Sequence, residues 1–175
     1  MKSSTLILTK ELGTFDAAHQ LPHHQGKCAN LHGHTYKVIA YVEGVLNRID
    51  GSSSEGMVID FSILKDVYKR RIESVIDHTF MLGEVPLPWV QKLTESHDLY
   101  IGDLGIGKLA YLPIPVTTAE FLSYWMVGEL WSGLSESTSM NNILRLTVEV
   151  FETPTSSASS EIVNIWREAD NEPEG

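Results

Sequence analysis

The chain has 175 residues, a length that favours one domain because two separately folded halves would each bury too little surface. Its 23 Asp and Glu against 13 Lys and Arg leave a net charge of −10, which argues against sequence-independent binding to nucleic acid. A single cysteine excludes an intrachain disulfide, and the N-terminal segment has too few consecutive apolar residues for a signal peptide or a membrane span, so we expect a soluble, cytoplasmic protein.

The first half of the chain has the pattern of two strands followed by a helix. We expect strands at residues 5–15 and 34–46, which are rich in β-branched and apolar residues and in part alternate them with polar ones. A turn rich in Gly and Ser follows at residues 51–56. Apolar residues then recur at steps of three and four through residue 76, which predicts a helix that begins near residues 57–61.

The second half is harder to interpret, because Pro86 and Pro88 interrupt residues 79–116. The expected elements are a short helix at 89–97, a short strand at 109–112, a long helix from residue 117, and strands at 142–152 and 160–167. This order of elements predicts an α+β fold with helices on one face of a mainly antiparallel sheet. We expect one domain over residues 1–167 and an acidic, frayed tail at 168–175.

Three histidines occupy positions from which they can reach one metal ion. His32 and His34 flank Gly33, and residues two apart in an extended chain project to the same face. Near the end of the first strand, His19 projects to the same face as Phe15. Pairing of the first two strands would therefore bring His19 close to His32 and His34. Three histidines with an open fourth position are typical of a catalytic zinc site, although imidazoles also accept iron, nickel or copper. The alternative is that His-Gly-His is a hairpin edge and His19 a hydrogen-bonded core residue.

Cys28 is the only thiol and lies four residues before His32. Three interpretations of it stay open. The first is a small buried hydrophobic side chain, and the second is a fourth zinc ligand that closes the site. The third is a thiolate that acts as a general base, with its pKa lowered by Lys27 and the metal.

Three acidic positions each have a structural and a functional interpretation. Asp77 and His78 lie where the first helix ends, so the imidazole either interacts with the helix dipole or forms a proton relay with the carboxylate. By the two-residue period of a strand, Glu152 lies on the same face as the apolar residues of its strand. A carboxylate buried on that face needs a partner. That partner is an Arg or Lys of the chain, or a ligand with paired N–H donors such as a pterin or guanine. Glu120 fits a capping box with Thr117 at the start of the second long helix.

As a set, these motifs resemble the 6-pyruvoyl-tetrahydropterin synthase / 6-carboxy-tetrahydropterin synthase family. The matching segments are 15–19, 28–36, 56–61, 77–78, 118–120 and 150–154. The Cys-x-x-x-His-Gly-His spacing is similar to that of the carboxy branch, which serves queuosine precursor synthesis. The resemblance implies a tunnelling fold with a four-stranded antiparallel sheet and two long helices per subunit, which oligomerises into a β-barrel, commonly as a homohexamer of two trimers.

The resemblance also implies roles for the matching residues. The implied zinc ligands are His19, His32 and His34, the implied catalytic residues are Cys28, Asp77, His78 and Glu152, and the implied substrate contacts are Thr118, Glu120 and Glu152. In this scheme Cys28 accepts a proton, Asp77 and His78 form a relay contributed by an adjacent subunit, and Glu152 anchors the pterin ring. Lys27 is a further candidate, for contact with the triphosphate.

The expected reaction is zinc-dependent carbon–oxygen lysis, which converts 7,8-dihydroneopterin triphosphate to 6-carboxy-5,6,7,8-tetrahydropterin, acetaldehyde and triphosphate. One alternative is the 6-pyruvoyl reaction on the same substrate, and another is a non-catalytic, metal-stabilised pterin-binding module. The chain departs from the family pattern at Phe121, where Asn is frequent, and in a long segment from Leu82 to Val116 that we expect to cap the pocket or contact a neighbouring subunit.

Overall fold

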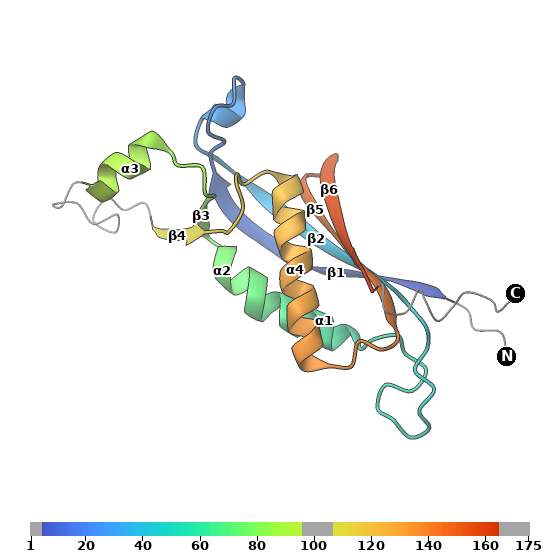
Figure 1. Ribbon diagram of the computed structural model, residues 1–175. Coiled ribbons are helices and arrows are strands. Elements are labelled where there is room, and N and C mark those ends of the chain that lie inside the picture. The colour runs from blue at the N-terminus through green and yellow to red at the C-terminus, as the bar shows by residue number, and fades with distance from the viewer. Residues whose placement is uncertain (1–4, 96–106, 165–175) are drawn as a thin grey trace, which may run out of the picture.

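A computed structural model describes residues 5–95 and 107–164 of the chain, and its centre is a six-stranded sheet (Figure 1). The strands are β1 (Leu6–His19), β2 (His32–Gly44), β3 (Thr79–Leu82), β4 (Lys108–Tyr111), β5 (Ile143–Thr153) and β6 (Ser156–Val163). Their order across the sheet is β4-β3-β1-β2-β5-β6. The four long strands pair antiparallel, whereas β3 lies parallel to β1 and β4 lies parallel to β3.

The predicted four-stranded sheet was therefore incomplete, although its α+β class and its antiparallel centre are as expected. Strand β4 matches the short strand predicted at residues 109–112, but β3 was not predicted. Both strands have four residues, too few for a periodic pattern to stand out. Hydrogen bonds to the neighbouring strand, rather than local propensity, determine their place at the edge of the sheet.

Two strands differ most from their predicted bounds. Strand β1 continues past residue 15 to His19, and a bulge between Glu11 and Gly13 shifts its register against β2. Strand β6 begins at Ser156 rather than at residue 160, because its serine-rich start pairs with β5 through the backbone although its side chains show little strand pattern. Residues 165–175, including the predicted tail, lie outside the described residues.

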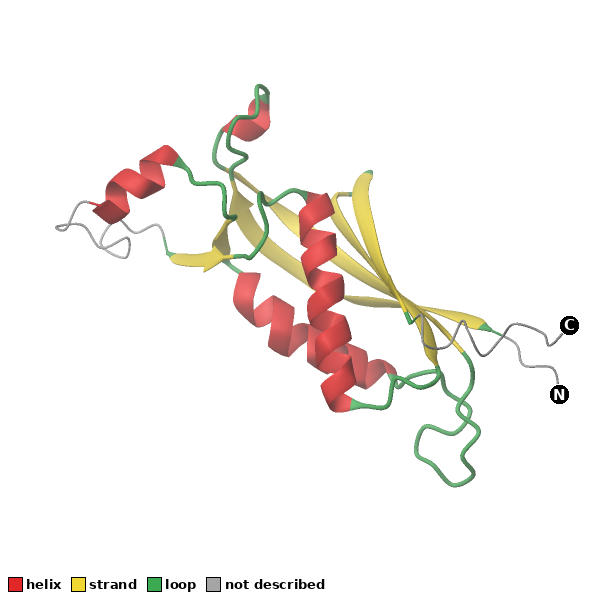
Figure 2. Cartoon of the chain, in the orientation of Figure 1, coloured by secondary structure: helices red, strands yellow, loops and turns green. Residues whose placement is uncertain are grey.

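Two long helical runs cover one face of the sheet (Figure 2). The first contains α1 (Phe61–Tyr68), a π-helical turn (Lys69–Glu73) and α2 (Ser74–Ile76), as predicted up to residue 76. The second is α4 (Ala119–Ser137). The two runs approach closely at Gly133, where an added Cβ would lie 2.5 Å from Cγ1 of Val67. Fully buried side chains of the sheet and both helices form one core.

The segment between β3 and β4 contains the remaining helix, α3 (Pro88–Glu95), close to the predicted short helix at 89–97, whose last two residues lie outside the described part. A satellite core of Phe80, Leu82, Leu87 and Val90 lies beneath it. Within the described ranges, none of the helices combines the length and the apolar character that a membrane span requires.

Candidate functional site

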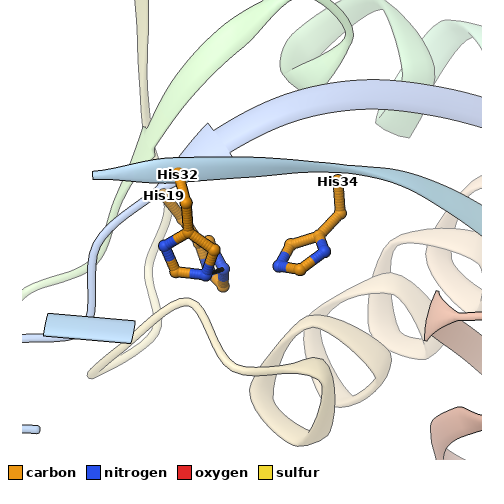
Figure 3. Close-up of side chains that lie close together, drawn as sticks. All are labelled: His19, His32 and His34. Carbon is orange, nitrogen blue, oxygen red and sulfur yellow. Dashed lines mark hydrogen bonds between the residues drawn. The ribbon is translucent and has the colours of Figure 1, made fainter. Parts of the chain in front are cut away.

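Three imidazoles meet at one end of the sheet, as the histidine spacing predicts. The β1–β2 register pairs His19 with His32, and His34 lies two residues further along β2 on the same face. One ligand nitrogen from each ring lies within 4.8 Å of the others. Figure 3 shows His32 and His34 projecting to the same side of β2, with the ring of His19 next to that of His32.

Backbone carbonyls orient two of these rings. His19 Nδ1 lies 2.8 Å from the carbonyl oxygen of Thr117, and His32 Nδ1 lies 2.8 Å from that of Asn30. A carbonyl can only accept a hydrogen bond, so each Nδ1 carries a proton, and in its neutral form each ring presents a bare Nε2. This is the arrangement that orients a metal-binding histidine.

The lone pairs of the bare Nε2 atoms repel one another, and a cation bound between them removes this repulsion. Nε2 of His19 and Nε2 of His32 are 3.1 Å apart, and two lone pairs at that distance repel unless a positive charge lies between them. Two nitrogens that each bind one tetrahedral zinc ion at about 2.1 Å would be separated by about 3.4 Å. Among the described residues, the buried Nε2 of His34 has no hydrogen-bond partner. The three residues therefore fit a divalent metal ion.

Burial keeps His19 in the metal-binding protonation state. The ring is completely buried, and this desolvation lowers the pKa of His19 from 6.5 to about 4, although its hydrogen bond to Thr117 acts in the opposite direction. The neighbouring rings of His32 and His34 act in the same direction as burial and lower this pKa further. At neutral pH the imidazole of His19 is therefore uncharged and able to bind a metal.

Glu152 lies beside the histidine cluster, at the end of the apolar face of β5. Its Oε1 is 3.5 Å from Nε2 of His19 and 3.8 Å from Nε2 of His34, and its side chain is 28% exposed. The groups nearest to this carboxylate are thus imidazoles, rather than the Arg or Lys that sequence analysis left open. Its partial exposure leaves it accessible to a ligand that contacts the cluster.

Tyr36 forms the inner wall of the site and was not identified from the sequence. Its ring stacks on Phe15 with centroids 4.7 Å apart and meets the edge of His34 at 5.5 Å. Its hydroxyl is buried and has no hydrogen-bond partner among the described residues. Burial, reinforced by the charges of Glu152 and Cys28, raises the pKa of Tyr36, which keeps this hydroxyl protonated. The two-residue period of the strand, which places Tyr36 on the same face as His32 and His34, could have identified it from the sequence.

Cys28 lies in a short 3-10 turn, Lys27–Ala29, within the β1–β2 loop, which we call the Cys28 turn. Its thiol is partly buried and does not belong to the histidine cluster, so the geometry disfavours the interpretation of a fourth zinc ligand. Its electrostatic effect on Tyr36 is consistent with a thiol near the site. The side chain of Lys27 is exposed at the start of this turn.

Asp77 and His78 form the predicted carboxylate–imidazole pair, with His78 Nδ1 2.9 Å from Asp77 Oδ1. Burial opposes ionisation of Asp77, but a hydrogen bond from the backbone N–H of Asp16 and the contact with His78 outweigh it and lower the pKa of Asp77. His78 has a φ of 56° and its side chain is 77% exposed. His78 lines a hollow of about 550 Å³, whose lining also includes His34.

Thr118 and Glu120 lie at the start of α4, directly after Thr117, whose carbonyl orients His19. Thr118 is the N-cap, and its hydroxyl accepts a hydrogen bond from the backbone N–H of Phe121. The predicted capping box of Thr117 and Glu120 was therefore wrong by one residue, because the carbonyl and hydroxyl of Thr117 face His19 instead. Glu120 is exposed in the first turn of the helix.

Comparison with known proteins agrees with this fold. The family model described as 6-pyruvoyl tetrahydropterin synthase matches residues 7–162. A 6-carboxy-5,6,7,8-tetrahydropterin synthase from Haemophilus influenzae is 35% identical over 149 residues, which cover 85% of this chain and 94% of the relative. The enzyme of the same name from Synechocystis is 44% identical over 75 residues, 43% of this chain and 57% of the relative.

Solved structures show the same architecture. The 6-pyruvoyl tetrahydropterin synthase of Plasmodium falciparum aligns with a TM-score of 0.70 and 25% identity, covering 91% of this chain and 99% of that one. Its counterpart from Plasmodium vivax aligns with a TM-score of 0.66 and 21% identity, covering 93% and 99%. The chain belongs to the 6-pyruvoyl / 6-carboxy-tetrahydropterin synthase family of enzymes.

Proposed function

We propose that this protein is a zinc-dependent lyase that converts 7,8-dihydroneopterin triphosphate and one water molecule to 6-carboxy-5,6,7,8-tetrahydropterin, acetaldehyde and triphosphate. The observation that carries the proposal is the convergence of three imidazoles, two of which present a bare Nε2, beside the half-buried carboxylate of Glu152. Membership of the family supplies the substrate class. We also expect the protein to act in the cytoplasm, in queuosine precursor synthesis.

In this proposal His19, His32 and His34 hold the zinc ion. Zinc supplies Lewis-acid chemistry, which acidifies the hydroxyl and C–H groups of a bound diol side chain. The carbonyls of Thr117 and Asn30 keep the Nε2 atoms of two rings directed at the ion. The buried ring of His19 also excludes water from one side of the site.

Glu152 binds the pterin ring in this scheme. A carboxylate accepts two parallel hydrogen bonds, which matches the paired N–H donors of a 2-amino-4-oxo ring. The partial exposure of Glu152 beside the cluster supports this role. Thr118 and Glu120 line the pocket from the start of α4, and Lys27 contacts the triphosphate from the exposed side of the Cys28 turn.

Proton transfer is assigned to Cys28 and to the Asp77–His78 pair. Cys28 as thiolate removes a proton from the substrate side chain, and the pair moves protons during loss of triphosphate. The low pKa of Asp77 supports this assignment, because it keeps the carboxylate 2.9 Å from His78 Nδ1 ionised and able to accept a hydrogen bond from that ring. We propose that the pair serves the site of an adjacent subunit in a homohexamer, since His78 is largely exposed in the single chain.

The carboxy reaction is preferred over the pyruvoyl reaction for two reasons. The gap between Cys28 and His32 has three residues, as in the carboxy branch, and the curated relatives compared above carry the carboxy name. Incubation of the zinc-loaded protein with dihydroneopterin triphosphate should release acetaldehyde together with triphosphate. Release of triphosphate with no acetaldehyde would assign the pyruvoyl reaction instead.

Two controls separate catalysis from simple metal binding. Cys28→Ala with zinc retained should lose turnover by about 10²–10⁴-fold, the usual contribution of a positioned acid–base group. Turnover close to that of the wild type would refute the thiolate role. X-ray absorption should show only nitrogen and oxygen around zinc, whereas a sulfur neighbour at about 2.3 Å would indicate a closed structural site.

A further inference from the structure

The segment between β3 and β4 reaches the loop that contains the Cys28 turn. Trp89 of α3 stacks on Phe80 of β3, with ring centroids 5.7 Å apart and an interplanar angle of 9°. Leu87 and Val90 complete the satellite core that holds this helix against the sheet. Figure 1 shows α3 and the β1–β2 loop at the same end of the molecule. The indole of Trp89 is therefore held firmly beside this loop.

Two hydrogen bonds connect Trp89 to the Cys28 turn through Gln20. Trp89 Nε1 donates to Gln20 Oε1 at 2.8 Å, and Gln20 Nε2 donates to the carbonyl oxygen of Ala29 at 2.8 Å. An indole N–H can only donate and a backbone carbonyl can only accept, so the chain of hydrogen bonds has a single direction. The amide of Gln20 is thus fixed at both ends.

The two ends of this connection are next to proposed site residues. Gln20 follows His19, the last residue of β1, and Ala29 follows Cys28. The backbone N–H of Leu21 also donates to the carbonyl of Cys28 at 2.9 Å. The amide of Gln20 therefore joins the end of the strand that holds a candidate metal ligand to the turn that holds the thiol.

The Cys28 turn has little else to hold it in place. None of its three residues is buried, so it has no anchor in the hydrophobic core. Its own backbone hydrogen bonds, from Ala29 to Gly26 and from Asn30 to Lys27, stabilise the turn but do not determine its position relative to the sheet. That position depends on the contacts of Gln20 and Leu21 on one side of the turn and, at its end, on the hydrogen bond between the carbonyl of Asn30 and His32 Nδ1.

We propose that Trp89 is a positioning residue which, through Gln20, holds the Cys28 turn in place beside the three-histidine cluster. Residues 83–95 would then have a role in the site that no sequence motif indicates. The proposal depends on the proposed function only for the role of the thiol as a base. Its structural content is that loss of the indole N–H releases the turn.

Trp89→Phe in the full-length, zinc-loaded protein tests this directly, because phenylalanine retains an aromatic ring on Phe80 and lacks the N–H. Cys28 is the only cysteine, so alkylation by iodoacetamide followed by mass spectrometry reports on this turn alone. At fixed pH, we expect alkylation of Trp89→Phe to be about fivefold faster, the effect of one lost hydrogen bond. Trp131→Phe, the same change on α4, should react at the wild-type rate.

Gln20→Met provides a second route to the same conclusion, since it removes both hydrogen bonds and nearly preserves side-chain length. Because Trp89 acts through Gln20, the double variant should react no faster than Gln20→Met alone. Equal alkylation rates for Trp89→Phe and Trp131→Phe, or additive effects in the double variant, would overturn the proposal. If Trp89→Phe does not fold, Gln20→Met compared with the wild type decides the question.

Kinetics separate this proposal from the proposed function. A misplaced base should lower kcat of Trp89→Phe while KM is nearly unchanged, because substrate contacts are retained. If Cys28→Ala retains turnover but Trp89→Phe still accelerates alkylation, the base role fails and the positioning role stands. If Cys28→Ala is inactive and Trp89→Phe alkylates at the wild-type rate, the positioning role fails and the base role stands.

Discussion

The buried histidine His19 should make the metal-free protein sensitive to mild acid. In the unfolded chain its imidazole has a pKa of 6.5, whereas burial lowers the pKa in the folded protein to about 4. As pH falls between these values the unfolded state binds a proton that the folded state does not. Stability from this residue is therefore fully present above pH 6.5 and is lost progressively as pH falls towards 4.

The size of the effect follows from the two pKa values. Between neutral pH and about pH 5, the difference in proton binding corresponds to roughly 2 kcal/mol of unfolding free energy. Across the whole window the loss approaches about 3 kcal/mol. These amounts are large beside a typical net stability of about 5–15 kcal/mol, so they should be measurable by urea denaturation.

The assay compares urea unfolding near neutral pH and near pH 5, in the presence of a chelator and at one protein concentration. His19→Asn should reduce the pH dependence of the unfolding free energy by about 2 kcal/mol relative to the wild type. His23→Asn is the matched control, because His23 is exposed and its φ of 65° is one that asparagine tolerates. An unchanged pH dependence in His19→Asn would refute the account of this buried ring.

Three further predictions test other parts of the molecule. His32→Ala should abolish the binding of one zinc ion per chain, measured by mass spectrometry under native conditions, and stoichiometric zinc in this variant would contradict the three-histidine site. Asp77→Asn should cost less than about 1 kcal/mol of stability, because its partner His78 is exposed, yet slow turnover by about 10²–10⁴-fold, and unchanged turnover would remove the pair from the mechanism. Gly133→Ala should lower the unfolding free energy by about 1–3 kcal/mol despite its better helix propensity, since the new Cβ would lie 2.5 Å from Val67, and a stabilised variant would disprove the close helix contact.

Local patterns in the sequence predicted a large part of the fold. The two-residue period of the long strands and the three- and four-residue steps of the helices are properties of short segments, and they are borne out by β2, β5 and both helical runs. The same period predicted that His32 and His34 face one side and that Glu152 ends an apolar face. Each of these inferences needs only the geometry of one extended strand.

Contacts between distant segments were decided by tertiary structure alone. The carbonyl that orients His19 comes from Thr117, 98 residues away, and the indole that binds Gln20 comes from Trp89, 69 residues away. Strand β3 and its parallel pairing were likewise absent from the sequence prediction. Such contacts depend on the register of paired strands and on the packing of loops over the sheet, and neither leaves a periodic signal in the residues concerned. The sequence therefore determined which side chains share a face, whereas only the packed structure decided which backbone groups hold them there.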